Sequence, residues 1–430
     1  MAVRDFIVRN ARLGVGEETT FQTAPSGSFP EAITPLVISP SSLVVDGLTQ
    51  DALENNDESV IQRDAKDRIL GLKSTAAKAS FAFDAKAVPS ASFLTSGVSS
   101  GARELSHRII YRHMFGAENV AVGSTVASGA STTAFDVGAG HGSRFTEGTW
   151  IAVENNAQTA RQWCFITDVS TDTLTVTPAL AATPDAGRIV WNGYNYAPSG
   201  SGATAPNRKT LTLNRVFSAY SELQYQLRGC FGAVNFKFPQ KFGELLSVAA
   251  DLMVTDWDVP SARSFPTTVV TDDMGTKAVF HQATLLVATR ASLDRAVTRR
   301  YEGIDVQLPS KWDPIPDGNA TQARAGAMQT AGRPQAVTAT LKVPFDADEY
   351  TAFTSRTERS VVLVLQIGSG LTASFLIFDL PRCTLAASPK PITLGEGRGG
   401  LELSLEGLRD NSISGGSGDH ALAPFRFAMI

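Results

Sequence analysis

The segment from Leu227 to Val259 contains two runs of alternating apolar and polar residues, separated by a turn. In the second run, Leu246 to Thr255, five aliphatic residues occupy every second position, and the residues between them are mostly small or polar. This period of two is typical of a β-strand with one buried face. The turn, Pro239 to Gly243, predicts an antiparallel hairpin whose second strand is longer than most strands of globular proteins. Such a strand implies a large sheet, with one face in the core and a polar face in contact with something other than the core.

Composition favours a mainly β protein. Of the 430 residues only 19% are charged, while glycine and proline are abundant, with 36 and 21 residues. This combination is typical of many turns between short strands. Lysine and arginine together number 38 against 42 aspartates and glutamates, a balance unlike that of a nucleic-acid-binding protein. We expect a mainly β fold, a sandwich or barrel, with one or two short helices.

The expected helices lie in two segments that break the strand pattern. Between Ala102 and Phe115 apolar residues recur at helical spacing, and Gly116 follows where many helices end. A shorter helix is expected from Asp346 to Phe353, because Asp346 and Glu349 have the spacing of a capping box. Thr284 to Arg300 is compatible with either a strand or a helix, and the other apolar runs are interpreted as strands.

Residues 124–192 look like a separate unit. Short apolar runs alternate there with turn residues, and Ser170 to Thr173 gives a tight hairpin signal. We interpret this segment as a small β-barrel or sandwich inserted into a main domain of residues 1–123 and 193–430. Three of the five tryptophans, Trp150, Trp163 and Trp191, fall within it. They are expected in its core, with an aromatic platform for sugars or oligonucleotides as the alternative.

Three further segments differ from the strand pattern of the main domain. Residues 1–58 are rich in proline and glycine, which indicates an extended arm with one or two edge strands. Residues 304–333 are polar, with prolines and alanines, and are expected to form a long loop. The last residues, Pro424 to Ile430, are apolar, so the C-terminus is expected to dock on a surface.

No pattern predicts a catalytic, cofactor or metal site. His107 and His113 lack the spacing of a metal-binding pair on one helix face. The three cysteines are far apart and odd in number, which argues against disulfides and zinc and favours buried thiols. Gly138 to Gly142 resembles a phosphate-binding loop, but strand-like residues follow where a helix is needed, so a turn is expected. We expect a non-enzymatic protein without a cofactor, although a triad assembled in space leaves no such pattern.

The N-terminus predicts synthesis in a cytoplasm. Arg4, Arg9 and Arg12 interrupt its only apolar stretch, which argues against a secretory signal peptide. No apolar run has the length of a membrane-spanning helix, so no membrane partner is expected.

Several short motifs follow one another in an order that carries a resemblance. They are Gly16 to Phe21, Phe81 to Phe83, Phe115–Gly116, Arg228 to Cys230, Glu244 to Trp257, Thr340 to Phe353, Leu380 to Arg382 and Arg409 to Asn411. In this order they resemble the tail tube (major tail) protein of long-tailed, non-contractile (siphovirus-type) bacteriophages. The resemblance covers most of the chain outside residues 124–192 and 304–333. It implies a tail-tube-like sandwich with an additional inserted domain.

The resemblance also implies a function and partners. Members of this family form rings, usually of six subunits, that stack into a tube through which double-stranded DNA leaves the capsid. The expected partners are further copies of the chain, a tape measure protein inside the tube, and tail terminator and distal tail proteins at its ends. DNA would pass without specific binding, and the protein would be located in the virion tail. The alternatives are a distal-tail or baseplate ring subunit and a carbohydrate-binding virion protein.

The polar strand faces are candidates for the wall of the lumen. Asp251 lies on the polar face of the second run, and Glu402 and Glu406 lie on that of the last strand. We expect these carboxylates to line the lumen and repel the DNA backbone, the alternative being that they lie outside. Residues 1–58, residues 304–333 and the C-terminus are expected to join stacked rings, and the insert to lie on the tube exterior.

Overall fold

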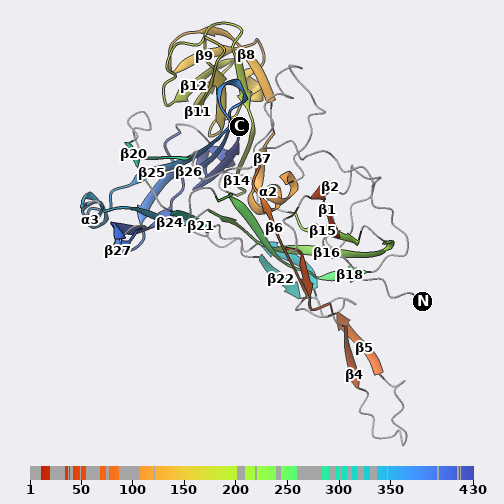
Figure 1. Ribbon diagram of the computed structural model, residues 1–430. Coiled ribbons are helices and arrows are strands. Elements are labelled where there is room, and N and C mark those ends of the chain that lie inside the picture. Colours follow the sequence, from red (N-terminus) through yellow and green to blue (C-terminus); the bar gives the residue numbers. More distant parts are fainter. Residues whose placement is uncertain are drawn as a thin grey trace, which may run out of the picture.

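A β-sandwich of two large sheets carries a closed barrel at one end (Figure 1). The computed structural model describes residues 11–19, 34–36, 38, 42–48, 50–54, 68–73, 77–86, 107–120, 122–200, 209–217, 220–238, 244–258, 283–289, 297–299, 303–307, 312–316, 324–329, 337–345, 347–394, 397–413, 416 and 418–430. Within these ranges the α-helices are α2 (Arg108–Phe115), α3 (Asp348–Thr354) and α4 (Asp419–Leu422). The prediction of a mainly β fold with short helices is confirmed.

The first sheet has eight strands and is built around the hairpin predicted at Leu227 to Val259. Its order is β2-β1-β15-β16-β17-β6-β3, and β18 also pairs with β16. The strands are β1 (Ala11–Glu17), β2 (Thr34–Leu36), β3 (Val44–Asp46), β6 (Lys78–Asp84), β15 (Leu211–Phe217), β16 (Tyr220–Lys237), β17 (Ser247–Met253) and β18 (Asp256–Asp258).

The second sheet has eleven strands and lies across the core from the first. Its main path is β20-β19-β25-β26-β28-β24-β21, and β27, β29, β14 and β7 branch from it. The strands are β7 (Gly116–Asn119), β14 (Tyr194–Pro198), β19 (Ala283–Thr289), β20 (Val297–Arg299), β21 (Gly303–Gln307), β24 (Val337–Pro344), β25 (Arg359–Ile367), β26 (Ser374–Leu385), β27 (Lys390–Thr393), β28 (Gly399–Gly407) and β29 (Arg426–Met429).

The predicted hairpin is present, but the lengths of its strands are reversed. β16 and β17 pair antiparallel, with Phe236 opposite Val248, and the predicted turn at 239–243 lies outside the described residues. The five aliphatics from Leu246 to Val254 are buried, as expected, whereas Asp251 is exposed. The long strand is β16, with 18 residues, and β17 has seven. The prediction of a long second strand is therefore wrong.

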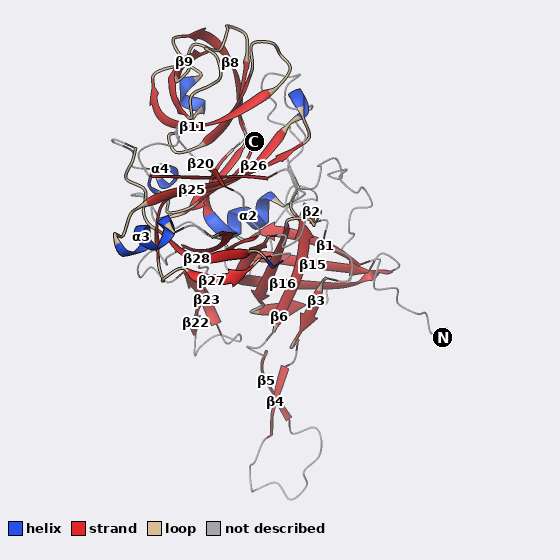
Figure 2. Ribbon diagram, turned by 60° about the vertical axis from the view of Figure 1, so that its left-hand side comes forward, coloured by secondary structure: helices blue, strands red, loops and turns tan. Residues whose placement is uncertain are grey.

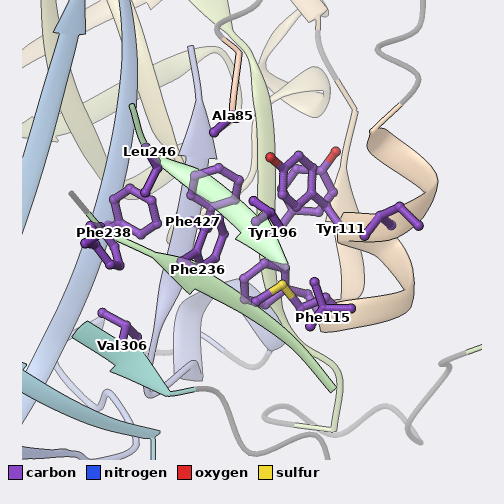
Figure 3. Packing of buried hydrophobic residues seen from close by; sticks show 14 of the residues in the cluster. Ala85, Tyr111, Phe115, Tyr196, Phe236, Phe238, Leu246, Val306 and Phe427 are labelled. Atoms are coloured by element: carbon purple, nitrogen blue, oxygen red, sulfur yellow. The ribbon is translucent and has the colours of Figure 1, made fainter. Parts of the chain in front are cut away.

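The core lies between the two sheets, whose apolar faces form one cluster together with one face of α2. Aromatic rings occupy its centre (Figure 3). The ring centroid of Phe236, on β16, lies 4.9 Å from those of both Phe378 on β26 and Phe427 on β29. Tyr111 and Phe115 of α2 add further rings at 5.1 and 6.1 Å from Phe427. Such ring pairs contribute about 0.5–1.5 kcal/mol each beyond their buried area, so this contact fixes how the sheets face each other.

α2 ends where the sequence predicts. Gly116 has a φ of +89°, a conformation that costs glycine little, and its N–H donates to the Arg112 carbonyl. The helix begins at Arg108, and residues 102–106 of the predicted helix lie outside the described residues. α3 begins at Asp348, with Ala347 as its N-cap and no side-chain cap, and Asp346 of the predicted capping box lies outside the described residues.

Three segments that were expected to make contacts between stacked rings contribute strands to the sandwich. β1 pairs with both β15 and β2, so Ala11–Glu17 is an inner strand and not an arm, whereas β2 and β3 are the edge strands that the sequence predicted. β21 pairs with β24 and buries Ile304 and Val306, and β22 (Trp312–Pro316) with β23 (Arg324–Gln329) forms a hairpin, so 304–333 is not one long loop. β29 pairs with β26 and β14, so the C-terminal residues are buried within their own subunit.

One hairpin stands away from the body of the molecule. β4 (Gln50–Glu54) and β5 (Arg68–Lys73) pair with each other and form a two-stranded sheet of their own. Both views place this hairpin at the end of the sandwich opposite to the barrel (Figures 1 and 2). Its first strand, β4, is the described part of residues 1–58 that best fits the predicted arm, and β5 lies beyond that segment.

Candidate functional site

The barrel spans Val122 to Asn192, where the sequence indicated an inserted unit at 124–192. Its strand order is β10-β11-β12-β9-β8-β13. The strands are β8 (Val122–Gly129), β9 (Ala134–Val137), β10 (Trp150–Glu154), β11 (Arg161–Ser170), β12 (Thr173–Thr177) and β13 (Ile189–Asn192). Its interior is filled by aliphatic residues, two phenylalanines and Cys164, and it therefore has a core separate from that of the sandwich.

The tryptophans of the barrel face the sandwich, and both sequence interpretations of them are wrong. Because side chains alternate along a strand, Ile151 and Val153 point into the barrel while Trp150 and Ala152 point out. Trp150 and Trp191 are 0% and 7% exposed and belong to the cluster between the barrel and the eleven-stranded sheet. They are neither the core of the barrel nor an exposed platform.

The sheet surface under the barrel is apolar as well. Along β25, Val361 and Leu363 face the sandwich core, whereas Val362 and Val364 face the barrel. The same alternation occurs in the other two strands under the barrel, where the barrel-facing residues are Phe375 and Ile377 of β26 and Ala428 and Ile430 at β29. These strands are buried on both faces, so the barrel seals part of the outer face of the eleven-stranded sheet.

The two connections to the barrel are strands that pair with each other. β7 leads into the barrel and β14 leads out of it, and β14 also pairs with β29. The side chain of Asn195 on β14 accepts the N–H of Trp150 at 2.8 Å and donates to its carbonyl at 3.1 Å. β14 is thus a largely buried strand. Two paired connections and a shared apolar surface hold the barrel in one orientation.

A buried ion cluster lies at this junction. Arg426 of β29 contacts Asp379 of β26 at 3.0 Å and Asp410 at 2.5 Å, and all three side chains are at most 2% exposed. Arg426 also donates to the carbonyls of His420 and Ala421, at 2.6 and 3.0 Å. Every nitrogen of the guanidinium thus has an acceptor, a condition that a buried charge must meet.

The barrel contacts the same cluster directly. The indole N–H of Trp150 donates to Oδ2 of Asp379 at 3.2 Å. The guanidinium of Arg426 lies over the ring of Phe165, 4.8 Å from its centroid, a cation–π arrangement. One arginine therefore connects two strands of the sheet, the segment around Asp410, the C-terminal α4 and the barrel.

Burial and mutual attraction shift the pKa values at this junction in different directions. Burial raises the pKa of Asp379 to about 6, although Arg426 opposes the shift. Burial acts in the same sense on Asp410, but Arg426 and the hydrogen bonds from Ser412 outweigh it and lower the pKa of that carboxyl. Burial, with the nearby charge of Arg426, lowers the pKa of His420 to about 3. His420 is therefore neutral in the folded protein at pH values where it is charged in the unfolded chain.

The substitution His420→Gln is expected to weaken the loss of stability at acid pH. Below pH 6.5 the unfolded chain protonates His420 and the folded chain does not, so the wild-type protein loses about 1.4 kcal/mol per pH unit from this group. Between pH 7 and pH 4.5 the wild type should lose on the order of 2–3 kcal/mol more than the variant. Urea unfolding at both pH values measures this difference, and parallel pH dependences would contradict it.

The loop Gly138 to Gly142, which resembles a phosphate-binding loop, binds the carboxylate of Asp172 from the same chain. The N–H groups of Gly140 and Gly142 donate to the two carboxylate oxygens of Asp172, both at 2.9 Å. These bonds lower the pKa of Asp172. A Cβ at Gly142 would clash with the carbonyl oxygen of Thr171, so the close approach requires glycine. The loop is a turn, as predicted, and its anion-binding groups are already occupied.

The other residues considered from the sequence are structural. His107 stacks on Phe83 with 4.0 Å between ring centroids, and Nδ1 of His113 lies 2.8 Å from the carbonyl of Lys209. Both histidines are buried, and so are the three cysteines. In the ranges that the structure describes, no three His, Cys, Asp or Glu side chains are grouped so that they could hold a metal ion.

A hollow of about 240 Å³ opens at the rim of the barrel. Its size is below that of ordinary ligand pockets, which start near 300 Å³. Its polar side chains bond within the chain: Asn155 accepts the N–H of Thr159, Asn156 accepts that of Asp185, and Gln162 accepts that of Ala181. Nothing in this hollow marks it as a binding site.

The three carboxylates predicted to line the lumen lie on two different sheets. Asp251 points away from the core on β17, opposite Ser80 of β6. Glu402 and Glu406 point away from the core on β28, in the eleven-stranded sheet. Because both sheets face the same core, their outer faces look in opposite directions, and one lumen cannot be lined by all three residues.

Comparison with known proteins gives no relative: no family model matches the chain, and no curated protein is detectably similar to it. Among the described segments, no helix has both the length and the apolar character needed to span a membrane. The arrangement of sheets, barrel and hairpin is therefore what bears on function.

Proposed function

We propose that this chain is the subunit of a tail tube of the kind found in long-tailed, non-contractile bacteriophages. Copies join into rings, with six subunits in each, and the rings stack into a conduit for DNA. The observation that carries the proposal is the eight-stranded sheet. Its apolar face is sealed in a sandwich, and its outward face across β16, β17 and β6 carries mostly short and polar side chains, with Phe231 and Met253 as the exceptions.

The ends of that sheet support assembly through neighbouring copies. They are β2 and β3, strands of only three residues, each pairing with part of the adjacent strand. Short end strands limit uncontrolled pairing, and closure into a ring removes the remaining edges. The β4–β5 hairpin projects from the body and supplies a second contact for a neighbouring subunit (Figure 2).

The carbohydrate-binding alternative loses the residues on which it rested. It required an exposed aromatic surface made of Trp150, Trp163 and Trp191, and the first and last of these are buried at the junction. A distal-tail or baseplate subunit shares the sandwich and the attached barrel, and differs from a tube subunit in stopping at one ring.

Negative-stain electron microscopy of the purified full-length chain tests the proposal. Open-ended tubes with a regular axial repeat are expected, because in the proposed tube each ring can accept a further ring at its end. Discrete rings would favour the distal-tail alternative. A chain that stays monomeric at high protein concentration would contradict both.

A further inference from the structure

We infer that, in the proposed tube, the eight-stranded sheet lines the lumen and the eleven-stranded sheet faces outward. The inference rests on the proposed function and deepens it. It places Asp251 on the lumen wall and Glu402 and Glu406 on the outer side of the tube. It therefore corrects the expectation that all three carboxylates face passing DNA.

The first reason is the position of the barrel. Barrel residues Trp150 and Phe165 pack in one cluster with Val362 and Ile377, which lie on the outer face of the eleven-stranded sheet. The buried contact between Trp150 and Asp379, and the paired strands β7 and β14, hold the barrel on that face. A face covered in this way is not available to form a continuous wall around a channel.

The second reason is size. A compact unit of about 70 residues, such as Val122 to Asn192, has a radius of gyration of about 11 Å. If the eleven-stranded sheet faced the lumen, every subunit of the ring would place such a barrel in the path of the DNA. With the sheet turned outward, the barrels stand on the exterior and the path stays open.

The third reason is the chemistry of the opposite face. Where β16 pairs with β17 and β17 with β6, the outward residues are Phe231, Ala233, Asn235, Lys237, Ser247, Ala249, Asp251, Met253, Lys78, Ser80, Ala82 and Asp84. Apart from Phe231, which is buried, and the half-buried Met253, these side chains are short, polar or charged, and no branched aliphatic or arginine side chain is among them. Two lysines are matched by two aspartates, so the face carries little net charge. DNA that touched it would release few of the counterions bound to its phosphates, and this release is the main source of non-specific DNA affinity. This surface suits a duplex that must slide without binding.

Cysteine labelling of assembled tubes tests the inference. Ser247→Cys places a thiol on the proposed lumen face, Ser404→Cys on the outer face of β28, and Ala157→Cys on the exposed surface of the barrel. Cys164, Cys230 and Cys383 are buried and give a low background. The probe is a maleimide on a polyethylene glycol too large to enter the tube, applied to intact tubes and to dissociated subunits, with a small maleimide as a reference.

The expected result is labelling of Ser404→Cys and Ala157→Cys in intact tubes and loss of labelling of Ser247→Cys, which returns on dissociation. Labelling of Ser247→Cys in intact tubes, with protection of the other two positions, would overturn the inference while leaving the tube itself established. Equal labelling at all three positions would also overturn it. A chain that forms no tubes would remove the proposed function and this inference together.

Discussion

The substitution Arg426→Ala is expected to lower the free energy of unfolding by about 3–5 kcal/mol, because it leaves two buried carboxylates without their cation. Asp379 and Asp410 are 2% and 0% exposed, and both contact the guanidinium. The loss should appear in the transition that exposes Trp150, which donates to Asp379. Urea unfolding followed by tryptophan fluorescence measures it. Arg409→Ala, which removes an exposed arginine near the same segment, should change stability by less than about 0.5 kcal/mol.

A triple variant separates charge from packing at this junction. Arg426→Met combined with Asp379→Asn and Asp410→Asn keeps the side-chain volumes close to those of the wild type and removes the uncompensated charges. Buried ion clusters replaced as a unit often cost little stability. The triple variant should therefore recover most of the loss seen with Arg426→Ala. Arg426→Met alone keeps a similar stem but leaves both carboxylates without their cation, so it is the matched control. If the triple variant is as unstable as Arg426→Met, the electrostatic explanation is wrong.

Local patterns predicted what depends on local physics. The five aliphatics from Leu246 to Val254 identified the buried face of β17, because a register slip by one residue would expose all of them. Gly116 identified the end of α2 because that position needs a positive φ. The length of β16 was missed because Gly229 and Gly232 interrupt its alternation, although the strand continues through both.

The barrel junction could be predicted only in part. Trp150 to Val153 and Val361 to Leu365 are unbroken apolar runs, the pattern of strands buried on both faces. This signal was sufficient to place a second layer over these strands. No local pattern could reveal the ion cluster, because Asp379 lies 47 residues from Arg426 and the segment around Asp410 reaches it only through the fold. An arginine in an apolar C-terminal run was the single available hint.

Deletion of residues 50–73, bridged by a short Gly–Ser linker, is expected to abolish tube formation while leaving the subunit folded. The β4–β5 hairpin forms a sheet of only two strands, and such a hairpin is marginally stable in water without a further surface. In the tube a neighbouring subunit supplies that surface. The purified variant should keep the wild-type circular dichroism spectrum and melting temperature, and electron microscopy should show single subunits or isolated rings.

The two outcomes assign different roles to the hairpin. Isolated rings would show that it joins one ring to the next, whereas single subunits would show that it closes the ring itself. When the variant is mixed with wild-type chains, it should shorten the tubes in the first case and stay excluded from them in the second. Tubes of normal length from the variant alone would contradict the expected role of the hairpin. Assembly would then depend on the ends of the eight-stranded sheet. There the three-residue strands β2 and β3 pair with only part of β1 and β6, and a neighbouring copy would pair with the rest.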